Sequence, residues 1–394
     1  MSNPSHNRTI TDTTSFKVFC AFDPYTVPQS SQHPDVDGSN TTEEKPEPYA
    51  SGELTTEMHQ TLSQMIRHFT SLSSLSPSSQ DQEHCVPFFN GKIISNIDDH
   101  GSGDNNDDGG NVRDILRRYA EDYGHIVHHV PHAVFVPFDT ESTRLIVQYM
   151  VQFNSHAIAP ELSSAVQLQL VVRGAGGNVC GAAQPLLPSS SSPPSSSSSS
   201  QHGHGRSTLC ILLDTSHMNT KIDTPIVDSS TKASASVWVD AGCTWLQVLK
   251  QVSSSAGYRP KTIPDYLNLT IGGTISIGGF GGDTILNGPC INNVNMVEVV
   301  TGTGEVVICS PNGDQSSREL FRAVRGGMGQ FGIVTRVNLA LERHDTMTRV
   351  YHLLFDSVNS LLDSTQLIYD KLVRDRRCIL RIQTVVVHNQ REVI

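Results

Sequence analysis

A run of glycines directly after a predicted strand is the first feature of this chain that could do chemistry. The apolar stretch VQLQLVVR at 166–173 has the composition of a buried strand, and the loop RGAGGNVCG at 173–181 follows it. In such a loop, successive backbone N–H groups can face a phosphate because no side chains stand in the way. The loop therefore predicts a pyrophosphate-binding site, although the same short motif also forms ordinary turns.

A carboxylate at the start of a second glycine-rich stretch is the other candidate for chemistry. The stretch DYLNLTIGGTISIGGFGG at 265–282 combines β-branched residues with three glycine pairs. We expect an extended backbone here, since glycine weakens a strand and is best explained where a ligand or another backbone approaches closely. Asp265 could act as an acid or base on a bound substrate, or it could open a turn after Pro264.

Four histidines precede the segment VFVP, and they raise the question of a metal site. They would share one face of a helix, but Pro131 and the neighbouring valines favour a strand, in which the histidines point to both faces. They are His125, His128, His129 and His132. We therefore predict no metal site there.

An acidic, glycine-rich tract at 98–110 has the residue spacing of the first half of a calcium loop. Ile115 stands where such a loop requires a bidentate Glu. We interpret the tract as a solvated loop, and we predict no metal ligand in the chain.

Helices and strands must position these groups. Two helices are expected from their apolar periodicity, one near 54–69 and one that begins at 112. Three more are expected to begin at capping residues: Asp139 or Thr140, Thr244, and Ser317. Strands are expected at 125–137, 166–173, 209–219 and 237–242, and the turn TGTG indicates a hairpin over 296–310. A strand at 333–342 should place on one face Ile333, Thr335, Val337, Leu339 and Leu341. Beyond it we expect a strand at 350–355, a helix over 358–372 and a strand at 379–387.

Composition restricts the class of protein. The 394 residues are enough for two domains, and the net charge of −11 without a basic block argues against a nucleic-acid partner. The N-terminus lacks the features of a secretory signal, and no stretch is long and apolar enough to span a membrane. Eight cysteines without a CxxC pair fit a reducing compartment. We expect a cytoplasmic monomer with no membrane partner.

Five segments taken together resemble the cytokinin dehydrogenases. They are RGAGGNVCG at 173–181, VDAGCTWLQVL at 239–249, PDYLNLTIGGTISIGGFGG at 264–282, NGPCINNVNMVEVVTGTGEVV at 287–307 and ELFRAVRGGMGQFGIVTRVNLALE at 319–342. This family belongs to the FAD-linked oxidoreductases with the vanillyl-alcohol-oxidase or PCMH type of FAD-binding domain. The resemblance implies an α+β fold, in which an FAD-binding domain of two α/β subdomains is followed by an incomplete α+β substrate domain.

The resemblance also implies roles for individual residues. Asp265 matches the catalytic aspartate of the family, and Ala182 falls where a flavin-contacting Gln is usual. The implied cofactor-binding residues are Gly174, Ala175, Gly176, Gly177, Asn178, Ala182, Asp265, Thr270, Ser276, Phe280 and Val334.

The implied reaction is the FAD-dependent oxidation of N6-isopentenyladenine-type cytokinins to an imine, which hydrolyses to adenine and an unsaturated aldehyde. Hydride leaves carbon for flavin N5 while the N–H must be held or deprotonated, and a partly buried carboxylate at Asp265 can accept that hydrogen bond. A quinone or another acceptor would then reoxidise the flavin.

Two departures from the family pattern stand out. Plant members have RGxGHS, with the His linked covalently to the flavin, whereas this chain has Gly177 and Asn178, so we expect non-covalent FAD. Cys180 is an alternative attachment point but reads better as a small buried residue. The chain also stops at Ile394, before the rest of the family's substrate domain.

These features predict a disordered leader at 1–80, a PCMH-type FAD-binding domain at 111–343 and a partial cytokinin-binding substrate domain at 344–394. A disordered Ser/Pro insertion is expected at 185–206. Two other functions stay open. One is an FAD-linked oxidase or dehydrogenase of an alcohol, sugar acid or hydroxy acid, and the other is an inactive, truncated flavin-binding remnant.

Overall fold

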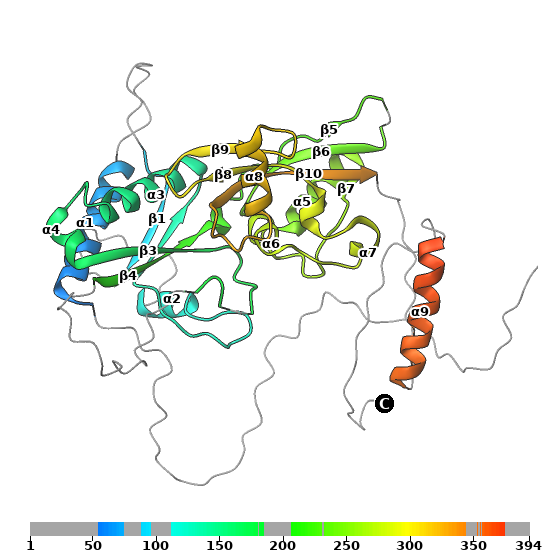
Figure 1. The fold of residues 1–394 in the computed structure, drawn as a ribbon, viewed down its shortest axis with the longest axis horizontal. Coiled ribbons are helices and arrows are strands. Elements are labelled where there is room, and N and C mark those ends of the chain that lie inside the picture. Colours follow the sequence, from blue (N-terminus) through cyan, green and yellow to red (C-terminus); the bar gives the residue numbers. More distant parts are fainter. Residues whose placement is uncertain are drawn as a thin grey trace, which may run out of the picture. The chain divides into compact units, whose positions relative to one another are not determined.

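Two β-sheets and the helices packed on them make up most of the described protein (Figure 1). The computed structural model describes residues 54–74, 88–95, 112–179, 181–184, 206–230, 232–343, 353, 355 and 357–374. The elements from α1 to β10 lie in one compact unit, and α9 (Val358–Arg374) lies in another. Across these ranges, no helix has the length and hydropathy needed to cross a bilayer.

Several predicted segments fall outside the described residues. They are the acidic tract at 98–110, residues 185–205 of the Ser/Pro insertion and the strand predicted at 379–387. Helix α9 confirms the helix predicted in the last part of the chain.

The first sheet combines parallel and antiparallel strands in the order β1-β2-β4-β3. β4 pairs in parallel with β2 and β3, and β1 pairs antiparallel with β2. The strand predicted at 166–173 is confirmed. The strand predicted at 209–219 is confirmed as far as Asp214 and is wrong beyond it, because Thr215–His217 form a 3-10 helix. The bounds are β1 (Gly91–Ser95), β2 (Ala133–Pro137), β3 (Val166–Arg173) and β4 (Ser207–Asp214).

Helices pack on both faces of the first sheet, because successive side chains of a strand point to opposite sides. On one face, Phe135 and Ile211 share a core with Phe69 of α1. On the other face, Val134 packs with Leu116 of α2. The helices are α1 (Thr56–Ser73), α2 (Val112–Arg118), α3 (Thr140–Asn154) and α4 (Pro160–Ala165).

Helix α1 confirms the helix predicted near 54–69. Its residues Leu62, Met65 and Phe69 are fully buried in the core of the first sheet. Both α1 and β1 precede residue 111, so the packed structure includes two elements N-terminal to the predicted start of the domain. One of them, α1, is a folded part of the predicted leader.

The four histidines precede β2 rather than lying in it, so that part of the strand prediction is wrong. The carboxylate of Asp122 accepts hydrogen bonds from the backbone N–H groups of Ile126 (2.8 Å) and Val127 (3.3 Å), which closes a turn. His125 within that turn has φ +52°, a conformation outside any strand. No group of side chains in the described ranges could hold a metal ion.

The second sheet is wholly antiparallel, with the order β5-β6-β10-β8-β9 and β7 paired to the end of β10. The predicted hairpin is confirmed as β8 and β9. The strands are β5 (Ile226–Val227), β6 (Ser234–Asp240), β7 (Tyr258–Pro260), β8 (Val294–Val300), β9 (Val306–Cys309) and β10 (Ile333–Arg343). The helices among them are α5 (Trp245–Ala256), α6 (Ile271–Ile277), α7 (Thr284–Asn287) and α8 (Gln315–Val324).

A β-bulge at Thr335 changes which side chains of β10 face which core. The pairing of β10 with β8 shifts between Val334 and Arg336, so Thr335 is an extra residue. Ile333 consequently packs in the core of the first sheet, whereas Val334 joins Val337 in the core of the second. The predicted single apolar face of β10 is therefore wrong at its start, because the bulge interrupts the two-residue period.

The glycine-rich stretch at 265–282 contains helix α6, so the prediction of an extended strand is wrong. The backbone N–H groups of Ile271 and Gly272 donate to the carbonyls of Cys243 and Ala241, both at 2.8 Å. These bonds satisfy two of the donors that the first turn of any helix leaves free. Tertiary partners therefore outweigh the β-propensity of the Thr and Ile residues.

The glycines of this stretch allow backbone segments to approach each other. A Cβ atom at Gly272 would lie 2.7 Å from the Cβ of Ala241, and one at Gly281 would lie 1.8 Å from the carbonyl oxygen of Ile263. The sequence left open whether these glycines admit a ligand or another backbone segment. At Gly272 and Gly281 the structure shows contact with another backbone segment.

Caps define the other helices. Asp139 caps α3, and Thr244 forms a capping box with Gln247 at the start of α5, both within the predicted alternatives. The cap of α8 is Asp314 rather than Ser317, whose own N–H donates to the Asp314 carboxylate at 2.8 Å.

Replacing Thr274 by Val should test the anchoring of α6. The indole N–H of Trp245 donates to Thr274 Oγ1 at 2.9 Å inside the core. Because Val leaves that donor unpaired, we expect the free energy of unfolding to fall by about 1–3 kcal/mol in urea titrations. Thr303→Val in the exposed β8–β9 turn is the control, and an equal loss in both variants would contradict this anchoring role.

Candidate functional site

The loop at 173–181, predicted to bind a pyrophosphate and called the glycine loop below, lies directly against the segment that leads into α6. A Cβ atom built on Gly174 would stand 2.2 Å from Thr270 Oγ1, and one built on Gly177 would stand 2.3 Å from Leu269 Cδ2. Both distances are far inside van der Waals contact. Two glycine-rich segments that are distant in the sequence therefore meet, and glycine at 174 makes the contact possible.

The guanidinium of Arg173 supports the glycine loop. Its Nη1 donates to the backbone carbonyls of Tyr119 and Glu121, both at 3.1 Å. Gly176 has φ +73°, and a Cβ there would lie 2.4 Å from the guanidinium. Burial lowers the pKa of Arg173 from its usual value, but a guanidinium stays protonated in proteins. A fixed positive charge thus lies beside the loop.

Asp122 supports the far end of the same loop. Its side chain is buried, and its carboxylate accepts the backbone N–H of Gly181 at 3.2 Å as well as that of Ile126. Burial acts to raise the pKa of Asp122, but the backbone donors and His128 outweigh it and hold the pKa below its usual range. The carboxylate is therefore ionised at neutral pH.

Tyr123 connects the glycine loop with the segment that carries Asp265. Its backbone N–H donates to the carbonyl of Asn178 at 2.8 Å. Its ring centroid lies 6.5 Å from that of Tyr266, the residue after Asp265. The structure thus links the phosphate loop and the candidate catalytic segment through one tyrosine.

The other predicted site residues lie on α6 and next to it. Thr270 occupies the N-cap position of α6 and is buried, and the hydroxyl of Ser276 donates to the carbonyl of Gly272 at 2.8 Å. Phe280 follows the helix with 70% of its surface exposed. Val334 is buried on β10 in the core that also contains α6.

Asp265 and Ala182 are both exposed. Asp265 lies in the irregular segment between β7 and α6, and Ala182 lies beyond the glycine loop. Side chains at the surface can meet a bound molecule, whereas the buried Val334 can do so only through its backbone or one edge of its side chain.

A cavity of about 510 Å³ adjoins the glycine loop. Its lining residues are Arg118, Glu121, Asp122, Tyr123, His125, Arg173, Ala175 and Gly176. Among the predicted site residues, only the loop positions 175 and 176 line this cavity. Asp265 and the residues of α6 lie outside it.

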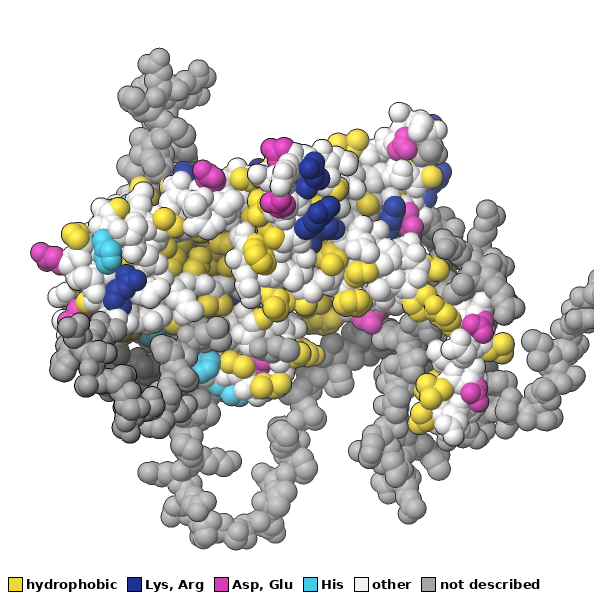
Figure 2. Space-filling model, in the orientation of Figure 1, with side chains coloured by type: hydrophobic (Ala, Val, Ile, Leu, Met, Phe, Trp, Pro, Cys, Tyr) yellow, Lys and Arg dark blue, Asp and Glu magenta, His cyan; other side chains and the backbone are white. Residues whose placement is uncertain are grey.

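Apolar side chains gather at the surface around α6 (Figure 2). Ile277, Phe280 and Met328 are each more than half exposed. The backbone N–H of Met328 donates to the carbonyl of Ser276 at 2.8 Å, which joins the loop before β10 to the end of α6. An exposed apolar patch of this kind is a candidate binding surface.

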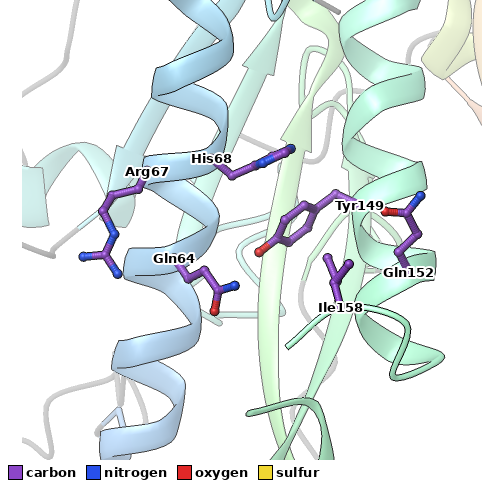
Figure 3. A pocket seen from close by; sticks show the side chains of 6 residues that line it. All are labelled: Gln64, Arg67, His68, Tyr149, Gln152 and Ile158. Carbon is purple, nitrogen blue, oxygen red and sulfur yellow. The ribbon is translucent and has the colours of Figure 1, made fainter. Parts of the chain in front are cut away.

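A second cavity, of about 390 Å³, lies between α1 and α3 (Figure 3). It is lined by Gln64, Arg67, His68, Tyr149, Gln152 and Ile158. The hydroxyl of Tyr149 has no hydrogen-bond partner in the described part of the chain, and burial raises the pKa of Tyr149 to about 12. This cavity contains no predicted site residue and does not belong to the candidate site.

Two buried amide side chains at the glycine loop also lack partners. The carboxamide atoms of Asn178 and Gln184 are buried and form no hydrogen bond with the residues that the structure describes. Such a group costs roughly 1–3 kcal/mol when it stays unpaired. FAD carries phosphate oxygens, hydroxyls and ring carbonyls that can pair with amides, so these residues fit that cofactor.

Three of these supporting residues were not predicted. The resemblance placed a flavin-contacting Gln at position 182, where this chain has Ala182. Gln184 lies two positions later, so the sequence did indicate a Gln in this region. Arg173 and Asp122 gave no comparable signal, because their partners lie 54 and 59 residues away in the chain.

Comparison with known sequences adds an independent observation. A family model described as an FAD binding domain matches residues 194–310. Cytokinin dehydrogenase 3 of Oryza sativa subsp. japonica is 32% identical over 249 residues, which cover 63% of this chain and 40% of the rice protein. Cytokinin dehydrogenase 2 of Arabidopsis thaliana is 31% identical over 241 residues, which cover 61% of this chain and 39% of that protein. Over these regions the chain is similar to the cytokinin dehydrogenases and to FAD binding domains.

The similarity to the cytokinin dehydrogenases is partial in length. The chain spans about two fifths of the curated relatives that it matches. The FAD-binding match at 194–310 includes Asp265, Thr270, Ser276 and Phe280. The glycine loop and Val334 lie outside this match.

Replacing Gly174 by Ala should weaken FAD binding. The added methyl group cannot fit against Thr270, so the loop and the start of α6 must move apart. We expect the FAD dissociation constant, measured by flavin fluorescence titration, to rise at least about tenfold. Gly302→Ala in the exposed β8–β9 turn, where an added Cβ would meet nothing within 4 Å, is the control. Unchanged affinity in the Gly174 variant would show that this contact does not shape the FAD site.

Replacing Gln184 by Met should change stability and FAD affinity in opposite directions. Without FAD, the variant no longer buries an amide that lacks a partner among the described residues, so we expect its melting temperature to rise by a few degrees. With FAD, a hydrogen-bonding partner is lost, so the dissociation constant should rise. Gln152→Met, at an exposed position of α3, is the control. A fall in both the melting temperature and the affinity for FAD would contradict the role of the Gln184 amide.

Proposed function

We propose that this chain binds FAD without a covalent bond and oxidises N6-isopentenyladenine-type cytokinins at their CH–NH bond. The observation that carries the proposal is the contact of the glycine loop with Leu269 and Thr270, which follow Asp265 closely in the sequence. Its second support is the similarity to the cytokinin dehydrogenases.

The glycine loop is the proposed site of the pyrophosphate. Gly174, Ala175, Gly176 and Gly177 offer backbone N–H groups without large side chains, and Arg173 adds a positive charge beside them. The amides of Asn178 and Gln184 then supply hydrogen bonds to further polar groups of the cofactor.

The surface around α6 is the proposed contact for the rest of the cofactor. Thr270 is held against Gly174, and Ser276 and Phe280 lie at the end of the helix. The exposed ring of Phe280 offers an aromatic face, and Val334 supports the helix from β10. Ala182, exposed beyond the loop, contributes no polar group.

Asp265 is the proposed catalytic residue. The backbone around it is anchored, since Leu267 and Leu269 accept hydrogen bonds from the N–H groups of Leu246 (2.9 Å) and Trp245 (3.2 Å). Its exposed carboxylate can therefore present a fixed acceptor to a substrate N–H. When bound, FAD supplies the two-electron acceptor, which a quinone or another oxidant regenerates.

The substrate change balances with one such acceptor. The secondary amine loses a hydride from carbon and a proton from nitrogen and becomes an imine. Water then adds to the imine and the C–N bond breaks, which releases adenine and an unsaturated aldehyde. Asp265 accepts the hydrogen bond of that N–H and then takes its proton in the first step, while the hydride leaves carbon for the acceptor.

The decisive experiment is anaerobic reduction of the FAD-loaded chain. We expect isopentenyladenine to bleach the oxidised flavin band, and Asp265→Asn to slow the bleaching by about a hundredfold or more, as is typical of a lost general base. Because Gly177 has no side chain to form a covalent link, acid precipitation should release all of the yellow flavin into solution. The control substitution is Asp363→Asn on α9.

Other outcomes would assign another function. Bound flavin that is bleached by an alcohol, sugar acid or hydroxy acid, and not by the amine, would make the chain a different FAD-linked oxidoreductase. A purified chain that binds no flavin would be an inactive remnant. Yellow colour that stays with the acid-precipitated protein would disprove non-covalent binding.

A further inference from the structure

A single carboxylate joins elements of both sheets. Glu298 on β8 accepts a hydrogen bond at Oε1 from the hydroxyl of Thr140 at 2.8 Å. Thr140 is the first residue of α3, which packs on the first sheet. The same oxygen accepts the hydroxyl of Thr335, also at 2.8 Å. One side chain thus holds α3 and the strand β10 of the second sheet together.

The bonds of Glu298 continue toward α6. Thr335 is the extra residue of the β-bulge and is fully buried. Its carbonyl accepts the N–H of Ala241 at 2.8 Å, and the carbonyl of Ala241 accepts the N–H of Gly272 at 2.8 Å. Gly272 lies in the first turn of α6, two residues after Thr270. A connected series of hydrogen bonds therefore runs from α3 to the helix that faces the glycine loop.

The sheets also meet at other places. Gln148 Nε2 donates to the carbonyl of Gly304 at 3.1 Å, and Val300 and Ile333 are buried in the core of the first sheet. Because these contacts remain when Glu298 is replaced, we expect the fold to persist while the relative position of the sheets becomes less defined.

We propose that Glu298 is a positioning residue, which sets the separation of the glycine loop and α6 and thereby the affinity for FAD. The loop belongs to the first sheet, and α6 packs on the second. A ligand that contacts two elements binds tightly only when the distance between those elements fits the ligand. This inference rests on the proposed function, since it assumes that FAD contacts both the loop and α6.

Three single variants and one double variant test the role of Glu298. Glu298→Gln keeps an acceptor oxygen, and its FAD dissociation constant should stay within about threefold of the wild type. Glu298→Met and Thr140→Val each break the bond between α3 and β8, and each should raise the dissociation constant about tenfold or more. The double variant Thr140→Val/Glu298→Met should be no weaker than Glu298→Met alone, because both changes remove the same interaction.

Hydrogen exchange in the protein without FAD is a second test, independent of the FAD dissociation constants. In the apo protein, hydrogen exchange at the amides of Ala241 and Gly272 should be faster in Glu298→Met than in the wild type, while α8 stays unchanged. Glu305→Met is the matched control, because Glu305 is an exposed carboxylate in the same β8–β9 hairpin. This control should alter neither exchange nor affinity.

The outcomes separate this inference from the proposed function. A wild-type chain that binds no FAD would overturn both. A wild type that binds FAD, with a Glu298→Met variant of lower melting temperature but equal affinity, would overturn only the positioning role. Equal loss of affinity in Glu298→Gln and Glu298→Met would also overturn it, since the retained oxygen would then have no effect.

Discussion

The hydrogen bonds between the first turn of α6 and the turn after β6 are the constraint on which the candidate site depends. Ile271 and Gly272 donate to Cys243 and Ala241, and the absence of a Cβ at Gly272 lets the two backbones come this close. Thr270 is thereby placed against Gly174. Together with the bonds that anchor Leu267 and Leu269, these hydrogen bonds fix the segment that leads from Asp265 into α6.

The glycine loop is held mainly by charged side chains from other parts of the chain. Arg173 bonds two carbonyls in the turn region after α2, and Asp122 from that region bonds Gly181 in return. Polar supports of this kind fix a loop without filling the space in front of it. The buried amides of Asn178 and Gln184, which have no hydrogen-bond partner among the described residues, are the counterpart of this arrangement, because a polar ligand would offset their cost.

Similarity to the cytokinin dehydrogenases gives this geometry its proposed chemical meaning. The matched FAD-binding region carries Asp265 and α6, and the loop that meets α6 precedes that region in the chain. A Gly at 177 leaves the loop without a nucleophile at the position where plant members attach the flavin. Under the proposed function, the affinity for FAD comes from shape and hydrogen bonds, which makes the relative position of the two sheets important.

The sequence by itself determined the features that depend on neighbouring residues. It predicted the glycine loop after β3, the β8–β9 hairpin, and the caps at Asp139 and Thr244, because turn residues, caps and side-chain periodicity act over a few positions. Only the tertiary structure decided that 271–277 is helical, that Thr335 forms a bulge and that Gln184 is buried at the loop. In each case, the deciding interaction comes from a distant segment: carbonyls after β6 for α6, Glu298 for the bulge, and for the loop the turn at Asp122. Local propensity cannot report such partners, since β-branched residues and glycines favour an extended chain until a backbone from elsewhere satisfies the helix.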